Sequence, residues 1–144
     1  MKKITAFIFI TFAIFSAHSF DWPQEEVIQS DQFYSYFGQL RGDTISNSLI
    51  FSEPSEIKSA DKGTLEIFIK EFNDNTDFFP STLGNAIIVA HSDNLLTVYG
   101  NIDYDTINTE LLKSSETIES GTIFGKSGNS AWQQGRSSLE FQVI

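Results

Sequence analysis

The chain has 144 residues, with 19 acidic and nine basic side chains, two histidines and no cysteine. Its net charge of −10 argues against nucleic acid and anionic lipid surfaces as partners, because both carry negative charge. The lack of cysteine excludes a disulfide framework.

The first 19 residues have the features of a secretory signal peptide. Met1-Lys2-Lys3 is basic, residues 4–15 are almost wholly apolar, and Ala17-His18-Ser19 supplies small residues for cleavage. A membrane anchor is the alternative, but the apolar run is shorter than the roughly 20 residues that cross a bilayer. We therefore expect a domain over residues 20–144, exported to the periplasm or cell envelope of a bacterium. It would have no membrane span after cleavage. Its net charge would be about −12, because the removed segment holds two lysines and no acid.

Strand patterns dominate the middle of the chain. Residues 64–70 alternate with β-branched and aromatic side chains, as in a half-buried strand. Residues 86–90 and 95–99 are apolar runs of strand length, and the turn formers between them include Asn94, which tolerates the left-handed conformation of a tight hairpin. The best helical candidate, residues 103–112, is short.

The C-terminal part also predicts strands, joined by tight turns at four closely spaced glycines. A short strand is expected at 122–124, and residues 138–143 alternate cleanly. This alternation directs Leu139, Phe141 and Val143 to the core, and Ser138, Glu140 and Gln142 to the opposite face. Residues 73–81 are predicted to form a long loop, whose acidic and aromatic side chains are either a partner epitope or a simple insertion. Together the patterns predict one antiparallel all-β domain, with sheet packed on sheet.

Several segments, in order along the chain, resemble the M23 (lysostaphin- or LytM-like) peptidase domain. These are WP at 22–23, FGQLR at 37–41, IKSADKG at 57–63, GNAIIVAHSDNLLTVY at 84–99, IESGTIFGKSGN at 118–129 and LEF at 139–141. The ordered series covers nearly all of residues 20–144. The resemblance implies an all-β sandwich with a groove, of the duplicated-hybrid-motif type. It also implies a link to peptidoglycan, whose peptides are the usual substrate of the family.

The same resemblance implies that active relatives hold zinc through an early HxxxD motif and the second histidine of a late HxH motif, with two more histidines beside the attacking water. Here the HxxxD motif falls on Ser46 and Ile50, the HxH motif on Ser138-Leu139-Glu140, and the histidine after the hairpin on Asn101. His91 matches a position that is not a ligand, and we expect it to be hydrogen-bonded at a strand end. The resemblance thus implies no catalytic residue, no metal ligand set and no bound cofactor.

Two groups of residues are candidates for binding. Asn101, Ser138 and Glu140 would line the vestigial groove and hydrogen-bond a peptide or glycan; the alternative is a solvated strand face. Trp132 and Arg136 are of the types favoured at partner contacts, although Trp132 could instead plug the end of the sandwich.

The sequence therefore predicts an exported, non-catalytic M23-like domain that binds peptidoglycan or regulates a cell-wall hydrolase. The alternative is a zinc metalloendopeptidase that cleaves peptidoglycan peptides through non-standard ligands. A structural envelope component with the same fold is a third hypothesis, since a fold alone does not assign a function.

Overall fold

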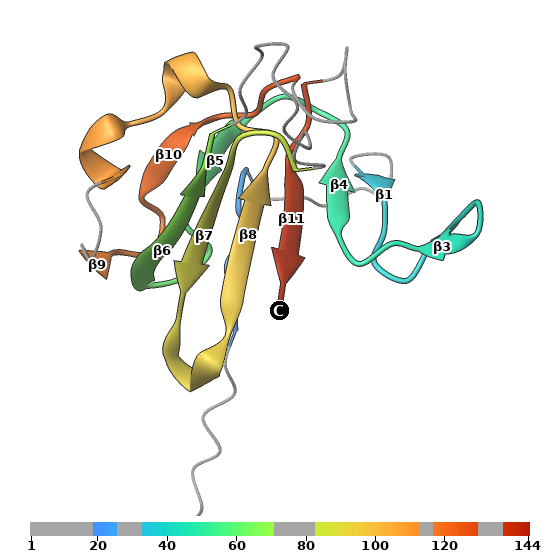
Figure 1. The fold of residues 1–144 in the computed structure, drawn as a ribbon, viewed down its shortest axis with the longest axis horizontal. Helices are drawn as coiled ribbons and strands as arrows, with labels where there is room; N and C mark the ends of the chain where they lie inside the picture. The colour runs from blue at the N-terminus through green and yellow to red at the C-terminus, as the bar shows by residue number, and fades with distance from the viewer. Residues whose placement is uncertain (1–18, 26–32, 71–82, 113–116, 130–136) are drawn as a thin grey trace, which may run out of the picture.

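The computed structural model describes residues 19–25, 33–70, 83–112, 117–129 and 137–144 (Figure 1). These residues form β-strands and short 3-10 helices, and no α-helix is found among them. The strands are β1 (Phe33–Ser35), β2 (Leu40–Arg41), β3 (Thr44–Ile45), β4 (Leu49–Phe51), β5 (Glu56–Lys58), β6 (Gly63–Ile69), β7 (Ala86–Ala90), β8 (Leu96–Gly100), β9 (Thr117–Ile118), β10 (Ile123–Lys126) and β11 (Glu140–Val143). The 3-10 helices are η2 (Ser92–Asn94), η3 (Tyr104–Thr106) and η4 (Thr109–Leu112). The predicted antiparallel all-β fold is confirmed.

A seven-stranded antiparallel sheet organises the domain, in the order β1-β4-β11-β8-β7-β6-β9. Its strands β6, β7 and β8 match the three predicted in the middle of the chain to within one residue at each end. The C-terminal strand β11 lies between β4 and β8, so segments far apart in sequence become neighbours (Figure 1). Two further sheets have two strands each, β5 with β10 and β2 with β3.

The β7–β8 hairpin is closed as the turn residues predict. Asn94 has a φ of 60° and Asp93 one of 62°, so both adopt the left-handed conformation that Asn and Asp tolerate. The pairing of Ala90 with Leu96 then sets the register of the whole hairpin, up to Ile87 opposite Tyr99. This register places Val89 and Tyr99 in the core.

The hydrophobic core lies between the large sheet and the small β5–β10 sheet. Tyr99 of β8 contacts Phe124 of β10 edge to face, with ring centroids 4.9 Å apart, and Phe141 of β11 lies 5.4 Å from Tyr99. Ile57 of β5 completes this contact between the sheets and is wholly buried. Each such side chain stabilises the fold by about 1.5–3 kcal/mol through burial. No helix in the described ranges is long and apolar enough to span a bilayer.

Two local predictions are corrected. Residues 103–112 form η3 and η4 rather than an α-helix, because the carbonyl and carboxylate of Asp103 accept hydrogen bonds from Thr106 and Asp105 and so close single turns. Val143 was expected in the core but is 44% exposed. Strand β11 pairs with β4 only through Glu140 and Phe141, whereas Gln142 and Val143 pair with β8 alone. Residues 73–81 lie outside the described ranges.

Candidate functional site

Three neighbouring strands bring together positions that the sequence assigns to a vestigial metal site. Glu140 in β11 pairs with Ile50 in β4 on one side and with Gly100 in β8 on the other. Asn101 directly follows Gly100, and Ser138 lies two residues before Glu140. Because these positions come from three separate parts of the chain, their convergence depends on the insertion of β11 between β4 and β8.

Asn101 connects three segments of the chain through hydrogen bonds. Its side-chain Nδ2 donates to the carbonyl oxygens of Gly128, at 2.8 Å, and Ser138, at 2.5 Å. Its own carbonyl accepts from the Gly128 N–H at 2.6 Å, and its N–H donates to Leu83 O at 2.6 Å. The residue is fully buried and has a φ of 63°. Asn101 thus fixes the end of β8 to the segments that precede β11.

Glycine at position 128 makes this arrangement possible. A Cβ there would lie 2.7 Å from the backbone N of Asp103 and 2.9 Å from the carbonyl carbon of Ile102. Both distances are shorter than any normal contact, so only glycine lets the two backbones approach.

Ser138 and Glu140 are buried, at 3% and 6% exposure, as is Asn101, so none of the three side chains is open to water in this structure. The alternation rule assigns a face to each residue of a strand, but it does not say that the second face is open to water. Strand β11 is an inner strand of the sheet, with β4 and β8 on its two sides. The Glu140 carboxylate accepts a hydrogen bond of 3.2 Å from Nε2 of Gln142.

The donors gathered at these positions do not fit a zinc ion. Structural and catalytic zinc sites use three or four nitrogen, sulfur or carboxylate ligands. Ile50 presents only hydrocarbon, the Asn101 Nδ2 donates to two carbonyls, and Glu140 supplies the one carboxylate. Ser46 donates to the carbonyl of Ser48 at 3.0 Å. Over the ranges described, no three His, Cys, Asp or Glu side chains group where they could hold a metal.

His91 directly follows β7, as expected, and takes part in a series of hydrogen bonds. Its Nδ1 is 2.8 Å from the carbonyl of Lys62, and its Nε2 is 2.6 Å from the hydroxyl of Thr97. Since a carbonyl only accepts, Nδ1 carries a proton. The Thr97 hydroxyl continues the chain to the Tyr99 hydroxyl at 3.1 Å, which accepts from the Ala60 N–H at 2.8 Å.

Thr97 and Tyr99, at the inner end of this series of hydrogen bonds, are fully buried. Burial raises the pKa of Tyr99 above its usual value of 10.0, against the lowering effect of the Ala60 hydrogen bond. The sequence did not predict the chain of contacts. A signal was present in Thr97, a polar residue inside an apolar strand and on the same face as Tyr99.

The predicted partner contacts at Trp132 and Arg136 lie outside the described residues. These two positions therefore remain predictions.

Comparison with known proteins identifies one curated relative and a group of similar folds. No protein-family model matches the sequence. The chain is 32% identical to an uncharacterized protein of Treponema pallidum (strain Nichols) over 120 residues, with 78% of each chain covered.

Among solved structures, a zinc-containing peptidase from Vibrio cholerae superposes with a TM-score of 0.61 at 18% identity, over 88% of this chain and 37% of that one. The catalytic domain of the M23 protein EnpA from Enterococcus faecalis gives 0.59 at 20% identity, over 77% of this chain and 78% of the domain. A chain in the structure of the pore-forming complex of SpoIIQ and SpoIIIAH superposes with a TM-score of 0.52 at 17% identity, over 87% of this chain and 72% of that one. The chain thus spans little more than a third of the Vibrio peptidase. At these identities the likeness is one of fold, and it confirms the M23-like architecture.

Proposed function

The chain belongs to the same family as the uncharacterized Treponema pallidum protein and has the M23 peptidase fold, and from this premise we propose that it is a non-catalytic M23-like domain. It would be exported through the signal peptide at residues 1–19. It would bind peptidoglycan or regulate a cell-wall hydrolase, and it would require no zinc.

The observation that carries this proposal is the chemistry at Ile50, Asn101 and Glu140. In the aligned positions the fold keeps its convergence of three strands, but the side chains are a buried hydrocarbon, an amide that holds two carbonyls, and a single carboxylate. Zinc lowers the pKa of a bound water to about 7 only when its ligands hold it firmly. Without such ligands the attacking water is not activated, and what remains is a scaffold for recognition.

A role in assembly is supported by one of the structural neighbours. The SpoIIQ–SpoIIIAH complex is formed by two different proteins, and a chain of it shares this fold. An M23-like domain can therefore act within a protein assembly, and we propose an envelope protein as partner for this chain as well.

Metal analysis together with a peptidoglycan assay tests the proposal. The full chain is expressed with residues 1–19 in place, recovered from the envelope fraction, and sequenced at its new N-terminus. We expect cleavage before Phe20, far less than one zinc per chain, and no release of soluble peptides from purified peptidoglycan. Sedimentation with peptidoglycan, or co-purification of a cell-wall hydrolase, would identify which of the two partners it binds.

An active M23 peptidase serves as the positive control for peptide release. Stoichiometric zinc with cleavage of cross-linked peptides would contradict the proposal and establish the alternative, a zinc metalloendopeptidase with non-standard ligands. Recovery of the chain with residues 1–19 intact would contradict the export step alone.

A further inference from the structure

An open stretch of strand edge lies at the C-terminal end of β11. Strand β4 pairs with Glu140 and Phe141 but begins at Leu49, so in the described residues no strand lies beside Val143 on that side. The opposite edge of β11 is paired with β8 as far as Ile144, whose N–H and carbonyl both bond to Leu96.

The pattern of these bonds determines where the backbone of Val143 points. In an antiparallel pair, successive residues direct their N–H and carbonyl groups alternately to the two sides. Ile144 is bonded to β8, whereas the carbonyl of Leu139 accepts from Phe51 on the β4 side. Val143 is adjacent to Ile144 and an even number of residues from Leu139, so its N–H and carbonyl point to the β4 side of β11. Strand β4 does not extend as far as Val143.

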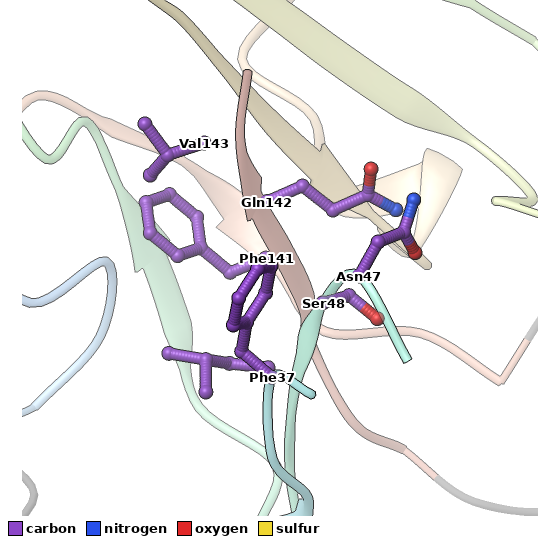
Figure 2. A pocket seen from close by; sticks show the side chains of 7 residues that line it. Phe37, Asn47, Ser48, Phe141, Gln142 and Val143 are labelled. Carbon is purple, nitrogen blue, oxygen red and sulfur yellow. The ribbon is translucent and has the colours of Figure 1, made fainter. Parts of the chain in front are cut away.

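A pocket of about 310 Å³ adjoins this edge (Figure 2). Its apolar wall is formed by Phe37, Leu49, Phe141 and Val143. Figure 2 shows Asn47 and Gln142 on the other side, with their amide groups close together. The pocket can hold one or two apolar side chains, and Phe37 at its rim is 72% exposed.

We propose that this edge binds an extended segment of another protein, which adds a strand alongside Val143 and inserts an apolar side chain into the pocket. A strand edge that no other described strand covers, beside an apolar pocket, provides both requirements of strand addition: main-chain hydrogen bonds give affinity and the pocket gives specificity. The inference does not depend on peptidoglycan binding, because Val143 lies at the C-terminal end of β11, whereas Glu140 and the neighbouring Asn101 lie at the start of that strand.

Charge indicates what kind of segment binds. The chain carries a net charge of −10, and an exposed aspartate, Asp93, lies in the neighbouring hairpin between β7 and β8. A second copy of the chain would bring the same charge to the contact, whereas a segment with lysine or arginine beside its apolar side chain would be attracted. The occupant is therefore a basic, extended polypeptide of a different protein.

Nuclear magnetic resonance titration of the purified chain tests this inference. The probes are capped seven-residue peptides in which lysine alternates with valine and the central residue is leucine, phenylalanine, tryptophan or aspartate. We expect the apolar peptides to shift the Val143 amide resonance and slow its hydrogen exchange. The aspartate peptide should bind at least about tenfold more weakly, because it loses the burial of one apolar side chain.

Two matched variants locate the binding site. Phe37→Ser removes a pocket wall and should weaken peptide binding about tenfold. Leu40→Ser changes a side chain of nearly equal exposure, 69%, that does not line the pocket, and should leave affinity within about twofold. Both side chains are exposed, so both variants should fold.

Three outcomes would overturn the inference. One is an unchanged Val143 resonance with every peptide at millimolar concentration, and another is equal weakening by the two variants. The third is occupation of the edge by a different partner. A second copy of the chain would be seen as a dimer in which the Val143 amide is protected, and peptidoglycan would be seen as a shift of the Val143 resonance when soluble fragments are added. Peptidoglycan binding without a Val143 shift would leave both proposals standing.

Discussion

Asn101 illustrates how one side chain can have a structural role at a position where the resemblance to M23 peptidases implies a histidine. Its amide donates to two carbonyls from different segments, and its backbone has a left-handed φ that few residues other than glycine and asparagine adopt readily. An imidazole has no such pair of hydrogens on a single nitrogen. The side chain is thus committed to the fold and is not available for water activation.

Replacing Asn101 with alanine should destabilise the protein by about 3 kcal/mol. Two buried carbonyls lose a donor, at about 1 kcal/mol or more each, and alanine adds about 1 kcal/mol of backbone strain at positive φ. Urea unfolding followed by circular dichroism measures the change.

Asn94→Ala is the matched control, because Asn94 also has a positive φ but is exposed at the hairpin turn. It should cost only the strain, about 1 kcal/mol. If the two variants lost the same free energy, the side-chain hydrogen bonds of Asn101 would contribute nothing to stability.

Tyr99→Phe should lower stability at neutral pH by about 1–2 kcal/mol, because the Ala60 N–H loses its buried acceptor. The substitution should also change how the free energy of unfolding depends on pH in the alkaline range. Burial raises the pKa of Tyr99 in the folded protein, so an unfolded chain releases this proton first, near pH 10. The folded state then binds more protons, and stability falls as pH rises above about 10.

Unfolding in urea at pH 8 and pH 11, for the wild type and Tyr99→Phe, measures this contribution. The wild type should lose more stability than the variant over this interval. An identical loss in both proteins would show that the ionisation of Tyr99 has no effect on folding.

At the scale of elements, the sequence predicts the long strands well and the short ones poorly. Strands β6, β7 and β8 have five to seven residues, enough for alternation or an apolar run to be visible. Strands such as β2, β3 and β9 have two residues each and carry no periodic signal. Their pairing is determined by partners distant in sequence, which local patterns do not contain.

Gly63, at the start of β6, shows how close packing between strands fixes one residue type. A Cβ at this position would collide with the carbonyl oxygen of Ala90 and lie 2.9 Å from Nδ1 of His91. Gly63→Ala should therefore separate β6 from β7 and cost about 3 kcal/mol, as overpacking of a core does. Thermal unfolding measures the effect.

Gly121→Ala is the comparison for this substitution. Gly121 has a φ of 78°, but a methyl group added there would meet no atom within 4 Å, so only strain of about 1 kcal/mol is expected. A Gly63 variant as stable as the Gly121 variant would mean that the strands adjust without cost.

At the scale of the whole molecule, the candidate site depends on topology more than on local sequence. The resemblance named Ile50, Asn101 and Glu140, and the sheet order brings them together because β11 returns between β4 and β8. Burial of Glu140 could not be predicted in the same way. Alternation along residues 138–143 defines two faces, but whether a face is covered depends on segments elsewhere in the chain.

If the scaffold of a metal site persists, restoring its ligands should restore zinc binding. We expect the triple variant Ser46→His, Ile50→Asp, Glu140→His to bind about one zinc per chain, measured by plasma mass spectrometry after dialysis. Without zinc this variant should be less stable than the wild type, because a carboxylate replaces the buried Ile50 side chain. Added zinc should raise its melting temperature, since an ion that binds only the folded state stabilises it.

The double variant Ser46→His, Ile50→Asp is the control, because it supplies the same buried carboxylate without the third new ligand. It should be destabilised to a similar extent but gain much less from zinc, since two strong ligands hold the ion far more weakly than three. Equal responses of the two variants to zinc would mean that position 140 does not face the other two. The strand register places Glu140 directly opposite Ile50, so position 140 faces at least that one of the two.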